Sequence, residues 1–151
     1  IWSYILENLA LRVDVNSFED ISATLQNAMY HKSAKVRRSA AWGLGKIKPS
    51  TEGRRMLMSA LGDETNPVRI SAYFSLLNDS LVSAKIIEEE IAAIDNNCQH
   101  VRLLLRILAK MHPERAYKLL ERINRNDPLW LEKQWLLREL NKNEKPANIT
   151  G

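Results

Sequence analysis

Three stretches align without a gap and decide the fold: "KVRRSAAWGLGKI" (35–47), "PVRISAYFSLLND" (67–79) and "HVRLLLRILAKMH" (100–112). Each contains a Val-Arg pair at its second and third positions, and successive pairs are 32 and 33 residues apart. Apolar residues return at the spacing of an amphipathic helix. A fixed period of this length is typical of a repeat protein, in which one small unit is copied along the chain.

A second helical segment separates the copies, so the repeating unit is a helical hairpin of about 32 residues. Four prolines stand where a periodic segment begins, a place where helices tolerate proline. No segment shows the alternating pattern of a strand. The sequence therefore predicts an all-α protein of roughly nine helices. These helices are expected over residues 2–13, 17–31, 34–47, 50–62, 67–78, 80–95, 98–111, 113–125 and 128–142.

The Asp and Val-Arg of "GDETNPVRISA" (62–72), with the Ala-Ala and Leu-Gly of the first copy, resemble the HEAT-like repeats, including the subtype named after phycobilisome lyases. The resemblance covers about residues 30–111. It implies an α-solenoid, or superhelix, of about four hairpins, in which each repeat contacts mainly its neighbours. We expect this solenoid over residues 1–143, with repeats at about 1–31, 32–63, 64–96 and 97–126, a terminal helix at 128–142 and a disordered tail at 144–151.

The resemblance also implies a role for the arginine of each Val-Arg pair. In that family this arginine stacks between repeats and pairs with an aspartate of the preceding turn. Asp63 lies six residues before Arg69 and fits this pattern, but the equivalent places in the other copies hold His31 and Asn96. We therefore expect an incomplete inter-repeat ladder. Its members are Arg37, Asp63, Arg69 and Arg102.

A helical wheel of the repeat shows apolar side chains on two sides. Val36 and Leu44 define the side expected to face the core, and Trp42 lies almost opposite. Phe74 and Ile107 take the place of Trp42 in the next two copies. The whole outward column consists of Trp42, Ile70, Phe74, Leu103, Ile107 and Met111. Either the flanks of the chain or a neighbouring domain cover this column, or it binds a separate protein.

Composition limits the class of protein and its compartment. Of the 151 residues, 45% are hydrophobic and 26% are charged, which is ordinary for a globular domain. No apolar run approaches the ~18 residues of a membrane span, and the opening residues lack the layout of a signal peptide. The single cysteine, Cys98, excludes an intrachain disulfide and fits a reducing compartment. We expect a cytoplasmic protein without membrane insertion, and a fragment of a longer chain.

Catalytic residues are not evident. The three histidines have no His or Cys partner at metal-ligand spacing, and no glycine-rich phosphate-binding motif occurs. Cys98 precedes His100 by two residues, which we interpret as a small side chain at a helix start rather than an activated thiol. We therefore expect a non-catalytic interaction or scaffold module, without a metal or a cofactor, whose partner is another protein or a neighbouring domain.

Charge suggests an alternative function. The net charge is +3 over residues 1–50, −4 over 51–100 and +5 over 101–151. The basic C-terminal half could contact nucleic-acid phosphates, although the acidic middle interrupts a continuous basic stripe. The candidate phosphate-binding residues are Arg102, Arg106, Lys110, Lys118 and Arg122. A second alternative, implied by the family resemblance alone, is a lyase-type subunit that attaches a chromophore together with another chain.

Overall fold

The structure is a computed structural model that describes residues 18–95 and 97–144. Over these ranges the backbone forms α-helices and no strand, which confirms the predicted all-α class. The helices are α2 (Phe18–Ala28), α3 (Ala34–Lys46), α4 (Thr51–Ala60), α5 (Asn66–Leu77), α6 (Ala84–Ala93), α7 (Cys98–Met111), α8 (Pro113–Glu121) and α9 (Trp130–Glu144). The helix predicted over residues 2–13 lies outside the described residues, as does the predicted tail beyond Glu144.

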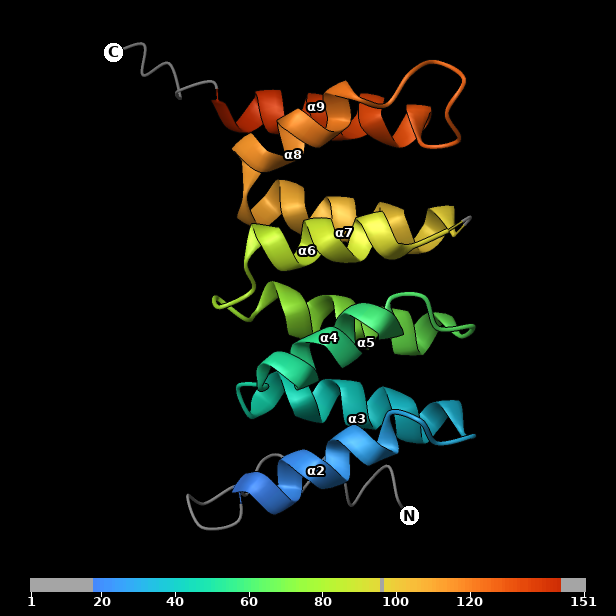
Figure 1. Cartoon of the computed structure of the whole chain (residues 1–151), viewed down its shortest axis with the longest axis vertical. Helices are drawn as coiled ribbons and strands as arrows, with labels where there is room; N and C mark the ends of the chain where they lie inside the picture. The colour runs from blue at the N-terminus through green and yellow to red at the C-terminus, as the bar shows by residue number, and fades with distance from the viewer. Residues whose placement is uncertain (1–17, 96, 145–151) are drawn as a thin grey trace, which may run out of the picture.

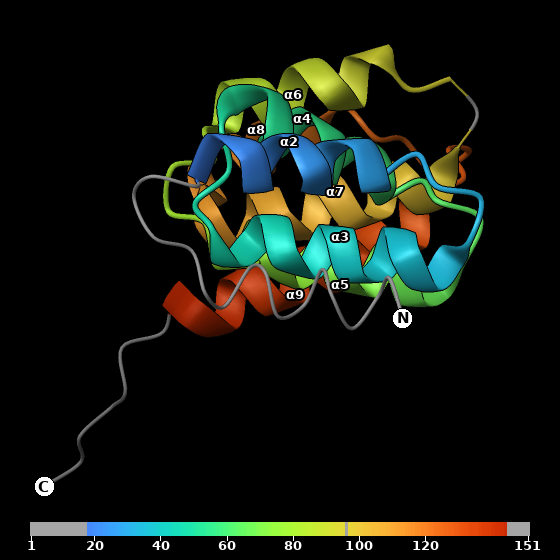
Figure 2. The ribbon, with the colours of Figure 1, turned by 90° about the horizontal axis from the view of Figure 1, so that it is seen from below.

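The helices follow one another along a single stack in chain order (Figure 1). Within this stack α3 packs along α5, α5 packs against α7, and α7 packs against α9. Figure 2 shows α2, α4 and α6 on one side of the stack and α3 and α5 on the other. Helix α9 is displaced outward on the side of α3 and α5.

The core lies on the side of the repeat where the helical wheel places it. Val36 and Leu44 of α3 are buried, and so are Val68 and Leu76 at the equivalent places in α5. Removing a large aliphatic side chain from water stabilises a fold by about 1.5–3 kcal/mol, so a repeated buried stripe is enough to join the helices. The predicted core residues are thereby confirmed in these two copies.

Side-chain caps set where several helices begin. The Ser50 hydroxyl accepts a hydrogen bond from the Gly53 amide at 3.1 Å, and the Asn97 side chain accepts one from the His100 amide at 3.1 Å. Ser83 caps α6 in the same way, through the Ile86 amide at 3.3 Å. Because a cap satisfies an otherwise unpaired backbone donor, the helix starts directly after it. Helix α6 therefore begins at Ala84 and is shorter than the segment predicted over 80–95.

Small residues let α3 and α5 approach closely. A Cβ atom added to Gly45 would lie 2.3 Å from the Ser75 hydroxyl oxygen and 3.0 Å from the Ser75 Cα. The same hydroxyl donates a hydrogen bond to the Ala41 carbonyl at 2.9 Å, from a buried position. The contact therefore leaves no room for a side chain at position 45 unless Ser75 moves, and it sets the distance between the helices that carry Trp42 and Phe74.

Candidate functional site

The first two copies of the predicted outward column remain partly open. Ile70 is 46% exposed and Phe74 is 56% exposed, both on α5. Trp42 of α3 is half-buried, and the Lys46 amine lies 5.2 Å from the centre of its ring. A cation over an indole face is a favourable contact that leaves the ring edge available.

These side chains line a groove of about 480 Å³ between α3 and α5. We call it the α3–α5 groove. Its residues are Trp42, Gly45, Lys46, Ile70, Ser71, Phe74, Ser75 and Asn78. Gly45, Ser71 and Ser75 form the low part of the groove because they have little or no side chain. Large apolar side chains stand beside them, so the close helix contact and the hollow have the same cause.

The third copy of the column is covered within the chain. Ile107 has no exposed surface, and Leu103 and Met111 are half-buried. Helix α9 packs against α7 and brings Leu136, which is 3% exposed, into the same core. The equivalence of Ile107 with Trp42 and Phe74 therefore holds in sequence but not in exposure. Ile107 follows His100 by seven residues and so lies on the same side of α7, where His100 reaches Met58 of α4. Ile107 is not available to a partner.

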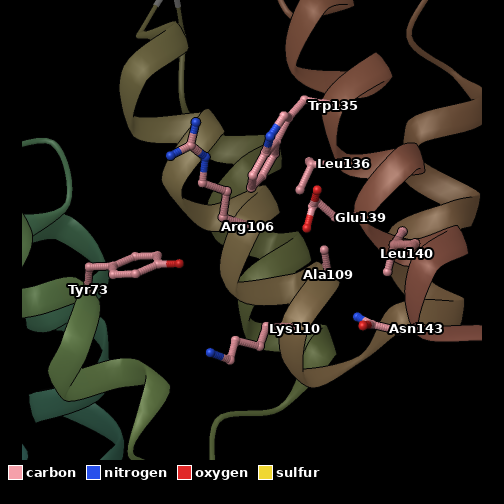
Figure 3. Close-up of a pocket in the computed structure, with 9 residues that line it drawn as sticks. All are labelled: Tyr73, Arg106, Ala109, Lys110, Trp135, Leu136, Glu139, Leu140 and Asn143. Carbon is pink, nitrogen blue, oxygen red and sulfur yellow. The ribbon is translucent and has the colours of Figure 1, made fainter. Parts of the chain in front are cut away.

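A second pocket, of about 310 Å³, is lined by residues of α5, α7 and α9 (Figure 3). We call it the α7–α9 pocket. It is lined by Tyr73, Arg106, Ala109, Lys110, Trp135, Leu136, Glu139, Leu140 and Asn143. The Tyr73 ring meets the Phe74 ring edge to face, with 5.6 Å between their centres. Because Tyr73 lines the pocket and Phe74 lines the α3–α5 groove, the two hollows adjoin.

Polar contacts hold the α7–α9 pocket in shape. Arg106 donates two hydrogen bonds to the buried Glu132 carboxylate, at 2.6 and 3.1 Å. This bond is the largest cause that raises the Arg106 pKa, so the guanidinium remains charged. The same guanidinium lies 5.0 Å from the centre of the Trp135 ring. Burial raises the pKa of Tyr73, which keeps its hydroxyl protonated as a donor.

The residues of the expected inter-repeat ladder make contacts with other partners than those expected. Arg37 binds the Asp63 carboxylate through two hydrogen bonds, at 2.8 and 3.1 Å. Arg69, the partner expected for that carboxylate, donates instead to the backbone carbonyl of Asp63. Arg37 likewise donates to the backbone carbonyl of His31 at 2.9 Å. The contact with the preceding turn therefore needs no aspartate, which corrects the expected Asp63–Arg69 side-chain pair.

The fourth ladder residue, Arg102, is also held differently. Its Nε lies 3.3 Å from the Glu132 carboxylate, without the geometry of a hydrogen bond. Arg102 and Arg106 thus share one buried carboxylate on α9. Both were candidates for phosphate binding, and that carboxylate offsets part of their charge. Of the other candidates, Lys110 lines the α7–α9 pocket, while Lys118 and Arg122 are exposed at α8.

Sequence reasoning missed a buried ion pair between α4 and the turn after α5. Arg54 donates two hydrogen bonds to Asp79, and both side chains are about nine-tenths buried. The partners in three such pairs, Arg37–Asp63, Arg54–Asp79 and Arg106–Glu132, are 26, 25 and 26 residues apart. A search for arginine followed by an acid at this interval would have found all three.

His100 forms a further contact across the stack. Its Nε2 donates to the backbone carbonyl of Met58 at 2.7 Å from a buried position. The ring passes so close to Gly62 that a Cβ there would lie 2.7 Å from its Nδ1. The imidazole therefore has a structural role at the start of α7. Cys98, two residues earlier, is a half-buried free thiol.

No group of three or more His, Cys, Asp and Glu side chains that could hold a metal ion is found in the residues that the structure describes. No helix among them is long and apolar enough to cross a membrane. No protein-family model matches the sequence, and a comparison with curated proteins finds no significant match.

Proposed function

We propose that the chain is an α-solenoid of HEAT-like hairpins that serves as a non-catalytic protein-interaction module in the reducing interior of the cell. The stacking of α3, α5 and α7 at a sequence spacing of 32 and 33 residues supports the repeat architecture. Ion pairs from one unit to the next, Arg54–Asp79 and Arg106–Glu132, support it further, because each repeat of a solenoid contacts mainly its neighbours.

The α3–α5 groove is the observation that carries the binding function. Ile70 and Phe74 are large apolar residues with about half of their surface exposed, and they stand together beside Trp42. Grouped apolar side chains at a groove are typical of protein interfaces, in which aromatic anchors supply much of the affinity. Buried side chains of the same helix already supply its core contacts, so stability does not require this second apolar side.

Site-specific photo-crosslinking in cells tests the function. A benzophenone amino acid is placed at Phe74, and separately at Tyr30 and Leu131, which are 76% and 79% exposed and lie outside both hollows. We expect discrete crosslinked protein bands from position 74 that are absent from the two control positions. The same weak pattern at all three positions, or none at position 74, would contradict a protein-binding groove.

A further inference from the structure

The helices that form the groove carry only one sign of charge. Helix α3 contains four Lys and Arg, α5 contains one and α7 contains three, and none of these helices contains Asp or Glu. Helices α4, α6 and α8, on the other hand, each contain at least one glutamate. Arg37 is paired with Asp63, and Arg102 and Arg106 share Glu132, so a bound segment meets positive charge where Lys46 and Lys110 border the two hollows.

Two of these cations border the hollows that a bound segment would occupy. Lys46 lines the α3–α5 groove, and Lys110 lines the adjoining α7–α9 pocket. Lys110 is exposed and has no ion pair with any described residue. The acid of the same pocket, Glu139, is already bonded to Lys142 at 2.7 Å. The charge of Lys110 is therefore uncompensated.

Tyr73 adds a second unused donor to the pocket. Its hydroxyl forms no hydrogen bond with the described residues, although the side chain is half-buried. Figure 3 shows this hydroxyl directed from α5 toward α7, where Arg106 and Lys110 extend. An ammonium and a phenol that border one pocket are suitable donors for a carboxylate, which accepts several hydrogen bonds.

We propose that the two hollows together bind one acidic amphipathic peptide segment of a partner protein. Its apolar side chains occupy the α3–α5 groove beside Trp42, Ile70 and Phe74. A carboxylate of the same segment reaches Lys110 and the Tyr73 hydroxyl in the α7–α9 pocket. This inference rests on the proposed protein-binding function and specifies the chemistry of the partner.

The apolar lining favours a peptide over a nucleic acid. Ile70 offers no stacking surface to a base, whereas an amphipathic helix presents aliphatic and aromatic side chains one turn apart to such a groove. In addition, Arg102 and Arg106 share the Glu132 carboxylate, which leaves fewer free cations for a phosphate backbone. Binding to nucleic acid would require several such free cations in a row.

The test is a displayed library of amphipathic 16-residue peptides, selected on the full chain. Their apolar positions vary among Leu, Ile, Phe, Met and Trp, and their polar positions vary among Glu, Gln and Lys. We expect selected peptides to be enriched in Glu over Lys. We also expect Phe74→Glu to abolish their binding, and Lys110→Glu to weaken it at least tenfold. The matched control, Lys118→Glu on α8, should change affinity less than twofold.

The outcomes separate the two proposals. Selected peptides that lose binding in Phe74→Glu but show no preference for Glu, or no effect of Lys110→Glu, would overturn the acidic partner and leave the groove as a protein site. If no selected peptide depends on Phe74 for binding, the acidic partner and the protein-binding groove are both overturned. Retention of single-stranded RNA or DNA that falls steeply with salt and is abolished by Lys110→Glu would assign the face to nucleic acid instead. Thermal unfolding of each variant confirms that it is folded. A peptide in which Lys replaces the Glu should bind the Lys110→Glu variant with restored affinity.

Discussion

Phe74 and Ile107 occupy the same place in successive copies of the repeat, but Phe74 is 56% exposed and Ile107 is fully buried. The difference comes from their surroundings. Ile107 lies on the side of α7 from which His100 reaches α4, whereas the α3–α5 groove is open beside Phe74. The contribution of an apolar side chain to stability depends on the surface it removes from water, so these two equivalent residues should differ in role.

Truncation of the two side chains measures this difference. Ile107→Ala should lower the free energy of unfolding by about 2–5 kcal/mol, because it leaves a cavity in the core around α7. Phe74→Ala should change it by less than about 1 kcal/mol, since its side chain is more than half exposed. Urea denaturation followed by circular dichroism gives both values. Equal losses would mean that Phe74 is a core residue and would remove support from the binding groove.

At the level of helix pairs, the contact between α3 and α5 depends on Gly45. Gly45→Ala adds a methyl group that would lie 2.3 Å from the Ser75 hydroxyl oxygen and 3.0 Å from its Cα. The better helix propensity of alanine is worth at most about 1 kcal/mol, and overpacking costs about 1–3 kcal/mol, so we expect a net loss of stability. Ser75→Gly removes the nearest atoms and should restore part of the loss in the double variant. Additive effects of the two substitutions in a urea-denaturation cycle would contradict this contact.

The turn between α4 and α5 should make stability sensitive to acid. Burial raises the Asp63 pKa, but hydrogen bonds from Arg37 and Thr65 outweigh burial and hold it below its usual value. The folded state therefore binds the proton less readily than the unfolded state, whose pKa is about 3.9. The stabilisation is present above that pKa and is lost as the pH falls through the lower folded value, over roughly pH 5 to 2.

Asp63→Asn should remove this acid-sensitive contribution. At neutral pH the variant should be less stable by about 1–3 kcal/mol, and its stability should fall less than that of the wild type between roughly pH 5 and 2. Glu64→Gln is the matched control, because the Glu64 side chain is 82% exposed and makes only a 3.3 Å contact with Arg37. Parallel pH profiles for the wild type and Asp63→Asn, measured by urea denaturation, would contradict the assigned role.

The positions of the helices could be predicted from the sequence, but the contacts between distant helices could not. Helices follow from apolar spacing because that signal is local, and the positions of α3, α5 and α7 agree closely with those expected. The burial of Ile107 depends on how α7 packs against helices far away in the sequence, which no wheel of a single helix contains. The partner of Arg37 was sought six residues upstream, whereas the carboxylate lies 26 residues downstream, at the end of the same predicted repeat. Such long-range pairs depend on how the helices pack, which the spacing within one helix does not contain.

Over the residues that the structure describes, several ion pairs link elements further along the stack. Arg37–Asp63, Arg54–Asp79 and Arg106–Glu132 each join an element to one about 26 residues further along. The His100 bond to Met58 reaches further, from α7 to the end of α4. A stack joined mainly in this way should lose stability locally when an end is removed, as in other repeat proteins. A protein with one shared core should instead lose it everywhere.

A chain ending at Asn126 distinguishes these cases, because it lacks α9 and the residues beyond it. Amide hydrogen exchange should speed up in α7, where Ala109 loses the cover of Leu136 and Arg106 loses the Glu132 carboxylate, while protection in α3 and α4 stays within about threefold of the full chain. In the full chain, Glu132→Gln removes the carboxylate but keeps the apolar cover, so it should affect α7 less than the truncation does. Uniform loss of protection from α3 to α8 in the shortened chain would rule out the solenoid. The core would then be shared across the stack, and the 32–33-residue spacing would have no energetic counterpart.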